Sequence, residues 1–172
     1  MVPAARLQVS VIVPCYKQAH FLHACVRSVL DQGRDDVEVV IVDDGSPDDT
    51  AVLAAGFGPP VKLVRQPNCG LPAARNAGVR AATGSLLMFL DADDAQAAGA
   101  IAAVMAVAAA DPTADVMCGG WQDMDAGGTP GAEHAPPAAE VDPWRLLLPH
   151  NAAPPCCWAV RRTALAAVGG FH

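Results

Sequence analysis

The chain has 172 residues, of which 52% are hydrophobic and 17% are charged, and its formal net charge is −7. This length suits one ordinary domain, and the apolar share is typical of a globular chain rather than a disordered one. The acidity argues against nucleic acid and against an anionic membrane surface as partners, because both attract clusters of Lys and Arg. A phosphate-bearing small ligand is not excluded, since a bound metal ion can invert the local charge.

The cysteines and the N-terminus favour a reducing, cytoplasmic location, with attachment to the inner membrane face through partners as an option. None of the six cysteines has Cys-x-x-Cys spacing, so we expect free thiols rather than a zinc site or a disulfide framework. Residues 1–8 lack the basic start and apolar core of a signal peptide. The Ala-rich run 95–110 is shorter than a membrane span and is expected to form a packed helix.

Apolar runs and helix-spaced apolar stripes alternate along most of the chain. The expected strands cover residues 8–14, 37–42, 61–64, 86–90, 116–118 and 155–160. The expected helices cover residues 20–32, 46–55, 68–82, 95–110 and 162–168. This strict alternation predicts an α/β fold with a parallel sheet and right-handed crossovers. After Trp121 the alternation stops, so a mobile loop is expected at 127–141 and one or two helical turns at 144–148.

The most informative segment is the apolar run 86–90, which leads directly into Asp91, Asp93 and Asp94. A continuous apolar run is typical of a parallel strand that is covered on both faces. Ligands of open α/β sheets bind outside the carboxyl ends of the strands, where these carboxylates are expected. Three neighbouring carboxylates repel one another unless a cation is present, and a hard divalent metal ion with phosphate oxygens suits them.

Three further polar segments are expected at the same edge of the sheet. They are residues 14–17 after the first strand, residues 43–46 after the second, and Arg75 with Asn76 in the first turns of a helix. Together they offer an aromatic ring, carboxylates for base or ribose donors, and a cation for phosphate. Such a set of groups meets the needs of a nucleoside diphosphate.

With these motifs in this order, the chain resembles the family 2 glycosyltransferases. The resemblance rests on residues 9–16, 40–46, 68–78, 89–94, 160–165 and 168–171. It implies the GT-A fold, a Rossmann-like, mostly parallel sheet flanked by helices. It also implies a nucleotide-sugar donor, for which a uridine diphosphate sugar is expected, and Mn²⁺ or Mg²⁺ as cofactor. The division implied is a nucleotide-sugar-binding subdomain at 1–120 and the start of an acceptor-binding subdomain at 121–172.

The resemblance assigns the nucleotide to residues at the ends of the first two strands and on the third helix. Pro14 and Tyr16 would line the base pocket. Asp43 or Asp44 would accept a hydrogen bond from the uracil ring, and Asp44 is the preferred candidate of the two. Arg75 would reach the base or the diphosphate.

The resemblance assigns the metal to the acidic segment after the fourth strand. Asp93 would bind Mn²⁺ or Mg²⁺ between the two phosphates, and Asp91 would hold the ribose or a metal-bound water. The metal would act as a Lewis acid on the leaving nucleoside diphosphate. The acceptor hydroxyl would attack the anomeric carbon with inversion while a carboxylate base takes its proton.

The chain departs from the family pattern where the catalytic base is expected. In the family this base follows a Gly-Gly-Phe-Asp-type segment, but here Gly169-Gly170-Phe171 is followed by the last residue, His172. The expected base would therefore lie beyond His172, and the catalytic residue is unknown. Asp123 and Asp125 are secondary candidates for contact with the donor sugar or the acceptor, and Trp121 for stacking on a sugar.

Two other functions compete with transferase activity. A truncated enzyme would bind nucleotide without turnover. The apolar surface left uncovered is expected to be either buried by self-association or exposed. A nucleotidyltransferase would need a Gly-rich, basic signature near the first strand, which residues 14–18 do not supply. Among the remaining polar residues, Arg161 and Arg162 are expected to form an exposed basic edge, and Asn76 to act in helix packing or capping.

Overall fold

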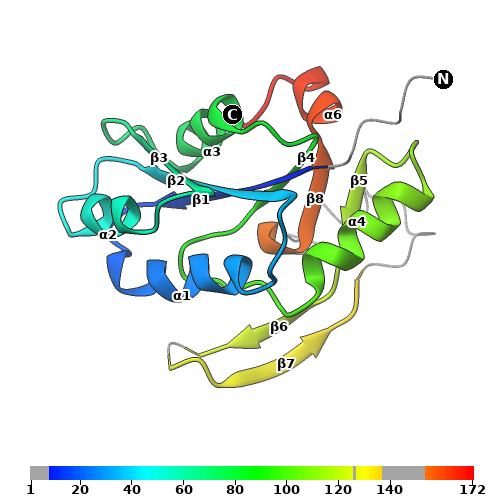
Figure 1. The fold of residues 1–172 in the computed structure, drawn as a ribbon, viewed down its shortest axis with the longest axis horizontal. Coiled ribbons are helices and arrows are strands. Elements are labelled where there is room, and N and C mark those ends of the chain that lie inside the picture. The colour runs from blue at the N-terminus through cyan, green and yellow to red at the C-terminus, as the bar shows by residue number, and fades with distance from the viewer. Residues whose placement is uncertain (1–7, 126, 137–153) are drawn as a thin grey trace.

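The computed structural model of the protein describes residues 8–125, 127–136 and 154–172 (Figure 1). The helical turns predicted at 144–148 lie outside the described residues, as does the end of the loop predicted at 127–141. The strands are β1 Val9–Cys15, β2 Val37–Asp43, β3 Val61–Arg65, β4 Leu86–Phe89, β5 Val116–Cys118, β6 Trp121–Met124, β7 Pro130–His134 and β8 Trp158–Arg161. The helices are α1 Ala19–Leu30, α2 Thr50–Gly56, α3 Leu71–Ala81, α4 Ala100–Ala110 and α6 Arg162–Ala167, with a 3₁₀ turn η1 at Pro155–Cys157.

The main sheet has the strand order β3-β2-β1-β4-β8-β5. β1 pairs in parallel with β2 and β4, and β2 pairs in parallel with β3. β8 lies between β4 and β5 and runs antiparallel to both. The prediction of a mostly parallel α/β sheet is confirmed. The sequence did not predict the direction of β8, whose antiparallel pairing with β4 needs no helical crossover.

Helices cover both faces of this sheet, which explains the continuous apolar runs 11–13, 39–42 and 86–89 in its central strands. In Figure 1, α1 and α2 lie on one face, while α3 and α6 lie on the other. Alternate side chains of β1 enter the two cores: Val11 faces the core shared with α1, and Ile12 faces the core shared with α3. α3 approaches β1 so closely that a Cβ atom on Gly78 would collide with the side chain of Ile12.

The structure differs from the sequence prediction at several elements. α2 begins at Thr50 rather than at residue 46, and residues 155–157 form η1 rather than the start of a strand. The loop predicted from residue 127 is wrong at Pro130–His134, which forms β7 and pairs with β6 as an antiparallel hairpin. Nearly all hairpin residues are exposed, so the hairpin carries no alternation of apolar and polar residues. The helix predicted from residue 95 begins only at Ala100, because Gly99 adopts a left-handed conformation with φ of 79°.

The helix α4 carries an apolar exposed surface. Its eleven residues are all Ala, Val, Ile or Met, and Val107 is 53% exposed. No helix in the described ranges is long and apolar enough to cross a membrane. Self-association through uncovered apolar surface stays a prediction.

Candidate functional site

The carboxyl ends of β1, β2 and β4 lie side by side and surround a cavity of about 400 Å³. This volume falls in the range of small-molecule sites. The cavity is lined by Pro14, Cys15, Tyr16, Gln18, Asp44, Asn68, Gly70, Leu71, Ala74, Asp91 and Asp93. The structure thus brings together five of the residues singled out from sequence: Pro14, Tyr16, Asp44, Asp91 and Asp93. The roles assigned to them stay predictions.

Asp44 is 4% exposed and is held firmly at the cavity wall. Its Oδ1 accepts hydrogen bonds from the side chain of Gln66 at 2.7 Å and from the backbone N–H of Cys69 at 3.0 Å. Its Oδ2 accepts from the backbone N–H of Gly70 at 2.9 Å. Three donors therefore fix the orientation of the carboxylate before any ligand arrives.

Asp43 is completely buried and does not line the cavity. Its Oδ1 accepts from the backbone N–H of Ser46 at 2.8 Å, and its Oδ2 accepts from Nε of Arg65 at 3.1 Å. These contacts shape the turn after β2. The sequence offered both Asp43 and Asp44 as acceptors for a nucleotide base. In the structure Asp44 lines the cavity, whereas Asp43 is buried in the turn.

Arg75 does not line the cavity but contacts a residue that does. Its Nη2 donates to Oδ1 of Asp91 at 2.9 Å, and its side chain is 11% exposed against 32% for Asp91. The guanidinium carbon lies 5.5 Å from the ring centre of Phe171. Arg75 thus orients the Asp91 carboxylate at the edge of the cavity and has little access to solvent.

Asp93 lies in a tight turn that follows β4, closed by a hydrogen bond from the backbone N–H of Asp94 to the carbonyl of Asp91 at 2.9 Å. The buried methyl of Ala92 anchors this turn, while Asp93 is exposed. None of the hydrogen bonds or ion pairs found in the described ranges uses the Asp93 carboxylate. No group of three His, Cys, Asp or Glu side chains in those ranges is arranged to hold a metal ion. A hard cation would fit here only if ligand oxygens completed its coordination.

Cysteine thiols near the site are unsuited to nucleophilic chemistry. Burial raises the pKa of Cys15, which lines the cavity, and of Cys25 beneath the acidic turn. Burial likewise raises the pKa of Cys157 to about 11. These thiols stay protonated at neutral pH, whereas the reactive form of cysteine is the thiolate.

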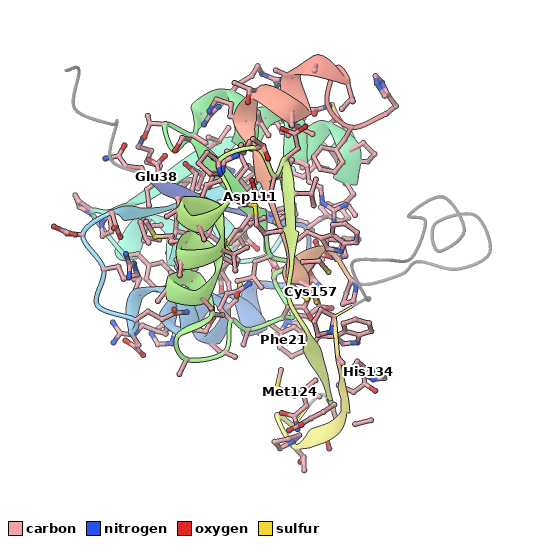
Figure 2. The ribbon with its side chains drawn as sticks, turned by 90° about the vertical axis from the view of Figure 1, so that its right-hand side faces the viewer. Phe21, Glu38, Asp111, Met124, His134 and Cys157 are labelled. Carbon is pink, nitrogen blue, oxygen red and sulfur yellow. The ribbon has the colours of Figure 1, made fainter. Side chains whose placement is uncertain are left out.

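A second, wider cleft of about 880 Å³ adjoins the first cavity, and Asp93 lines both. One wall is the segment from Asp93 to Ala97, another is η1, and the hairpin β6–β7 forms the third. Figure 2 shows Met124 and His134 on this hairpin, below Cys157 of η1. Besides Asp93, its charged lining residues in the described ranges are Asp94 and Asp123. Burial raises the pKa of Asp94 despite a hydrogen bond from Cys156, and the charges of Asp91 and Asp93 add to the rise.

The hairpin holds the secondary candidates in different ways. Asp123 lines the cleft and lies 3.0 Å from Nε2 of His134, whose ring stacks on Trp121 with ring centres 4.8 Å apart. Trp121 also lines the cleft. Asp125 instead accepts hydrogen bonds from the backbone N–H groups of Gly127 and Thr129 and shapes the hairpin turn. Asp123 and Trp121 can therefore meet a ligand in the cleft, and Asp125 is committed to the turn.

Arg161 and Arg162 do not form the exposed basic edge expected from sequence. Arg161 donates to the carbonyls of Ala108, Asp111 and Ala114, and Arg162 donates to those of Val79 and Gly84. Both guanidinium groups thus satisfy carbonyls at helix C-termini and in the following loops. This part of the sequence interpretation is wrong, because helix C-termini supply carbonyl acceptors that a sequence does not display.

Sequence reasoning missed Gln18 and Asn68 as cavity-lining residues, and it missed the partner of Asn76. Asn76 exchanges two hydrogen bonds with the backbone of Phe171. Asn68 directly precedes Cys69 and Gly70, whose backbone N–H groups bind Asp44, but these contacts are visible only in the structure. No local pattern connects positions 76 and 171.

A mostly parallel sheet with a cavity at the carboxyl ends of its strands is the arrangement in which open α/β proteins bind their ligands. Residues 10–169 match the model of the family described as Glycosyl transferase family 2, so the chain belongs to that family. The family expected from the sequence and the α/β GT-A fold are both confirmed.

Relatives of known sequence agree with this assignment. The chain is 38% identical over 89 residues to the uncharacterized glycosyltransferase EpsJ of Bacillus subtilis. That alignment covers 50% of this chain and 26% of EpsJ. This chain is also 39% identical over 89 residues to the hyaluronan synthase of Pasteurella multocida, and that alignment covers 50% of this chain and 9% of the synthase.

Solved structures match over nearly the whole chain. A mannosyltransferase of Pyrobaculum calidifontis, in complex with GDP-Man and Mn²⁺, matches with a TM-score of 0.72 and 26% identity, over 99% of this chain and 49% of that one. TarS of S. aureus in complex with UDP matches with a TM-score of 0.72 and 22% identity, over 96% of this chain and 50% of that one. This chain therefore spans about half the length of both solved chains.

Proposed function

We propose that this chain is the donor-binding part of a glycosyltransferase that moves a sugar from a UDP-sugar to a hydroxyl acceptor. The reaction would invert the anomeric carbon and use Mn²⁺ or Mg²⁺. The observation that carries the proposal is the meeting of Tyr16, Asp44, Asp91 and Asp93 in one cavity at the carboxyl edge of the sheet. In this proposal residues 1–120 bind the donor, and residues 121–172 begin the acceptor-binding part.

The cavity offers the groups that a uridine needs. The buried Asp44 carboxylate is fixed by three donors and can accept a further hydrogen bond from a ring N–H. Tyr16 is 41% exposed at the cavity wall, which leaves its ring free to stack on a base. Asp91, oriented by Arg75, can accept from the ribose hydroxyls.

Asp93 is the residue that would hold the cation, with diphosphate oxygens as its other ligands. When bound, the cation would neutralise the charge that develops on the leaving nucleoside diphosphate. Support comes from the exposed carboxylate of Asp93, which has no hydrogen bond or ion pair to any described residue, and from the mannosyltransferase that was solved with GDP-Man and Mn²⁺. The same hard oxygens suit Mn²⁺ and Mg²⁺.

The wider cleft is the proposed place of the acceptor, because it shares Asp93 with the donor cavity. An acceptor there could stack on Trp121 and donate a hydrogen bond to Asp123. Neither residue is assigned the role of catalytic base.

The proposal is tested by calorimetric titration of the protein with UDP and with GDP, each with and without Mn²⁺. We expect Mn²⁺ to enhance UDP binding. We expect Asp93→Ala to weaken the UDP affinity measured in Mn²⁺ by about a hundredfold, because it removes a metal-coordinating carboxylate. Asp115→Asn is the matched control, since Asp115 is an exposed carboxylate that precedes β5 at the opposite edge of the sheet. Binding that ignores Mn²⁺, or that Asp93→Ala leaves unchanged, would refute the metal role. Tighter binding of GDP than of UDP would refute the choice of nucleotide.

A further inference from the structure

The end of the described chain contacts the helix that carries Arg75. The C-terminal residues lie beside α3 in Figure 1. Nδ2 of Asn76 donates to the carbonyl of Phe171 at 2.7 Å, and Oδ1 of Asn76 accepts from the backbone N–H of Phe171 at 3.0 Å. One amide side chain thus satisfies both main-chain polar groups of a residue 95 positions away. We call this pair of hydrogen bonds the Asn76–Phe171 clamp.

The backbone before Phe171 is shaped to reach this clamp. α6 ends at Ala167, and the next turn contains Gly169 and Gly170, with φ of 81° and 88°. Such positive φ values favour glycine. A Cβ atom on Gly170 would also lie 2.6 Å from Oδ1 of Asn76. A side chain at position 170 would therefore be strained and would push the clamp apart.

The clamp places the ring of Phe171 between the sheet and Arg75. The ring meets Phe89, at the end of β4, edge to face, with ring centres 4.8 Å apart. The guanidinium carbon of Arg75 lies 5.5 Å from the centre of the Phe171 ring, within the range of a cation–π contact. Arg75 in turn donates to Asp91, which lines the donor cavity. A continuous set of contacts thus links Asn76 to the cavity through Phe171, Arg75 and Asp91.

We infer that Asn76 is a positioning residue for the donor site: it fixes Phe171, which holds Arg75 against Asp91. This inference rests on the proposed function, since it gives the clamp a role in donor binding. Phe171 restricts the guanidinium to the side facing Asp91. Without the clamp, Arg75 would regain rotational freedom, and Asp91 would lose the partner that orients it.

The first test needs no ligand. Nitrogen-15 NMR of the arginine side chains reports rotation about the Nε–Cζ bond, which we expect to be slow for Arg75 in the wild type. Asn76→Ala should make it fast, whereas Arg161→Gln should not. Arg161 is the matched control because it also binds backbone carbonyls, but at the amino end of β4, where it pairs with Leu86. Slow Arg75 rotation in Asn76→Ala would overturn the inference.

The second test separates positioning from general destabilisation. We expect Asn76→Ala to weaken UDP binding in Mn²⁺ by about tenfold, the effect of one charge-assisted hydrogen bond. Arg161→Gln should lower the melting temperature about as much as Asn76→Ala does, but it should leave UDP affinity unchanged. In an Arg75→Ala background, Asn76→Ala should have no further effect on affinity, because the two act through one contact. Additive losses would overturn the inference.

The two tests distinguish failure of the inference from failure of the proposed function. If the wild type binds neither UDP nor GDP while Asn76→Ala frees Arg75, the clamp stands as the structural support of Arg75 and the donor assignment fails. If UDP binds and Asn76→Ala changes neither Arg75 rotation nor affinity, the proposed function stands and the clamp has no positioning role.

Discussion

Polar side chains have different surroundings at the amino and carboxyl ends of the parallel strands of the main sheet. At the amino edge, Glu38 accepts from Ser10 at 2.6 Å, from the N–H and hydroxyl of Thr83, and from Lys62 at 2.6 Å. Arg162 donates to the carbonyl of Gly84 in the same region. These polar groups at the amino edge are thus paired with one another and with the backbone, so they contribute to the stability of the fold.

At the carboxyl edge some polar groups are fixed and others are left for a ligand. Asp44 and Asp91 are oriented by protein donors, whereas Asp93 and the ring of Tyr16 remain exposed beside the cavity. The difference indicates where this protein can bind a ligand. The candidate functional groups are those that the fold orients but leaves able to make further contacts. Substitutions at the two edges should therefore separate stability from binding.

The largest combined effect is expected for Asp44→Ala, at the carboxyl edge. The substitution leaves the donors of Gln66, Cys69 and Gly70 without their acceptor in a buried position. We expect a loss of about 3 kcal/mol in the free energy of unfolding, measured in urea, together with loss of UDP binding. A drop below about 1 kcal/mol would show that water replaces the carboxylate and that the site is not preformed.

The next effect is expected at the amino edge and depends on pH. Burial would raise the pKa of Glu38, but hydrogen bonds from Lys62, Ser10 and Thr83 outweigh it and lower the pKa to about 2. The ionised carboxylate therefore stabilises the fold above its ordinary pKa of 4.5, and this contribution is lost as the pH falls from 4.5 towards 2.

Glu38→Gln should accordingly lower the unfolding free energy at pH 7 by about 2 kcal/mol, and the difference from wild type should shrink below pH 4 or so. Urea unfolding at several pH values measures it. UDP affinity at pH 7 should not change, since Glu38 lies at the edge opposite the cavity. A pH-independent difference would mean that packing, not charge, is the contribution of Glu38.

The smallest effect on stability is expected in the hairpin. Asp123 is 60% exposed and pairs with a half-exposed His134, so Asp123→Ala should change the unfolding free energy by about 0.5 kcal/mol or less. UDP affinity should stay at the wild-type value, while transfer to an acceptor should fall if the wider cleft binds it. Weaker UDP binding in Asp123→Ala would place the hairpin in the donor site instead.

Most of the cavity at the carboxyl edge of the sheet was predictable because its signals are local. Runs such as Leu86–Phe89 are apolar wherever both faces of a strand are buried, and the acidic residues follow directly. The hairpin Trp121–Met124 with Pro130–His134 was not predictable, since main-chain pairing and one ring stack hold it rather than an apolar pattern. The late start of α4 was likewise hidden, because Gln96 is held by Ser28 and Cys156 from distant parts of the chain.

The sequence by itself determined the family, the mostly parallel α/β fold and the convergence of Pro14, Tyr16 and the aspartates on one edge. The family follows from the resemblance of the ordered motifs to those of known members. The fold and the convergence follow from periodicity and from the rule that parallel strands end together. Only the tertiary structure decided that Asp44 rather than Asp43 faces the cavity, that β8 runs antiparallel, and that Asn76 holds Phe171. Each of these depends on which groups meet across long separations, and such contacts leave no local pattern in the chain.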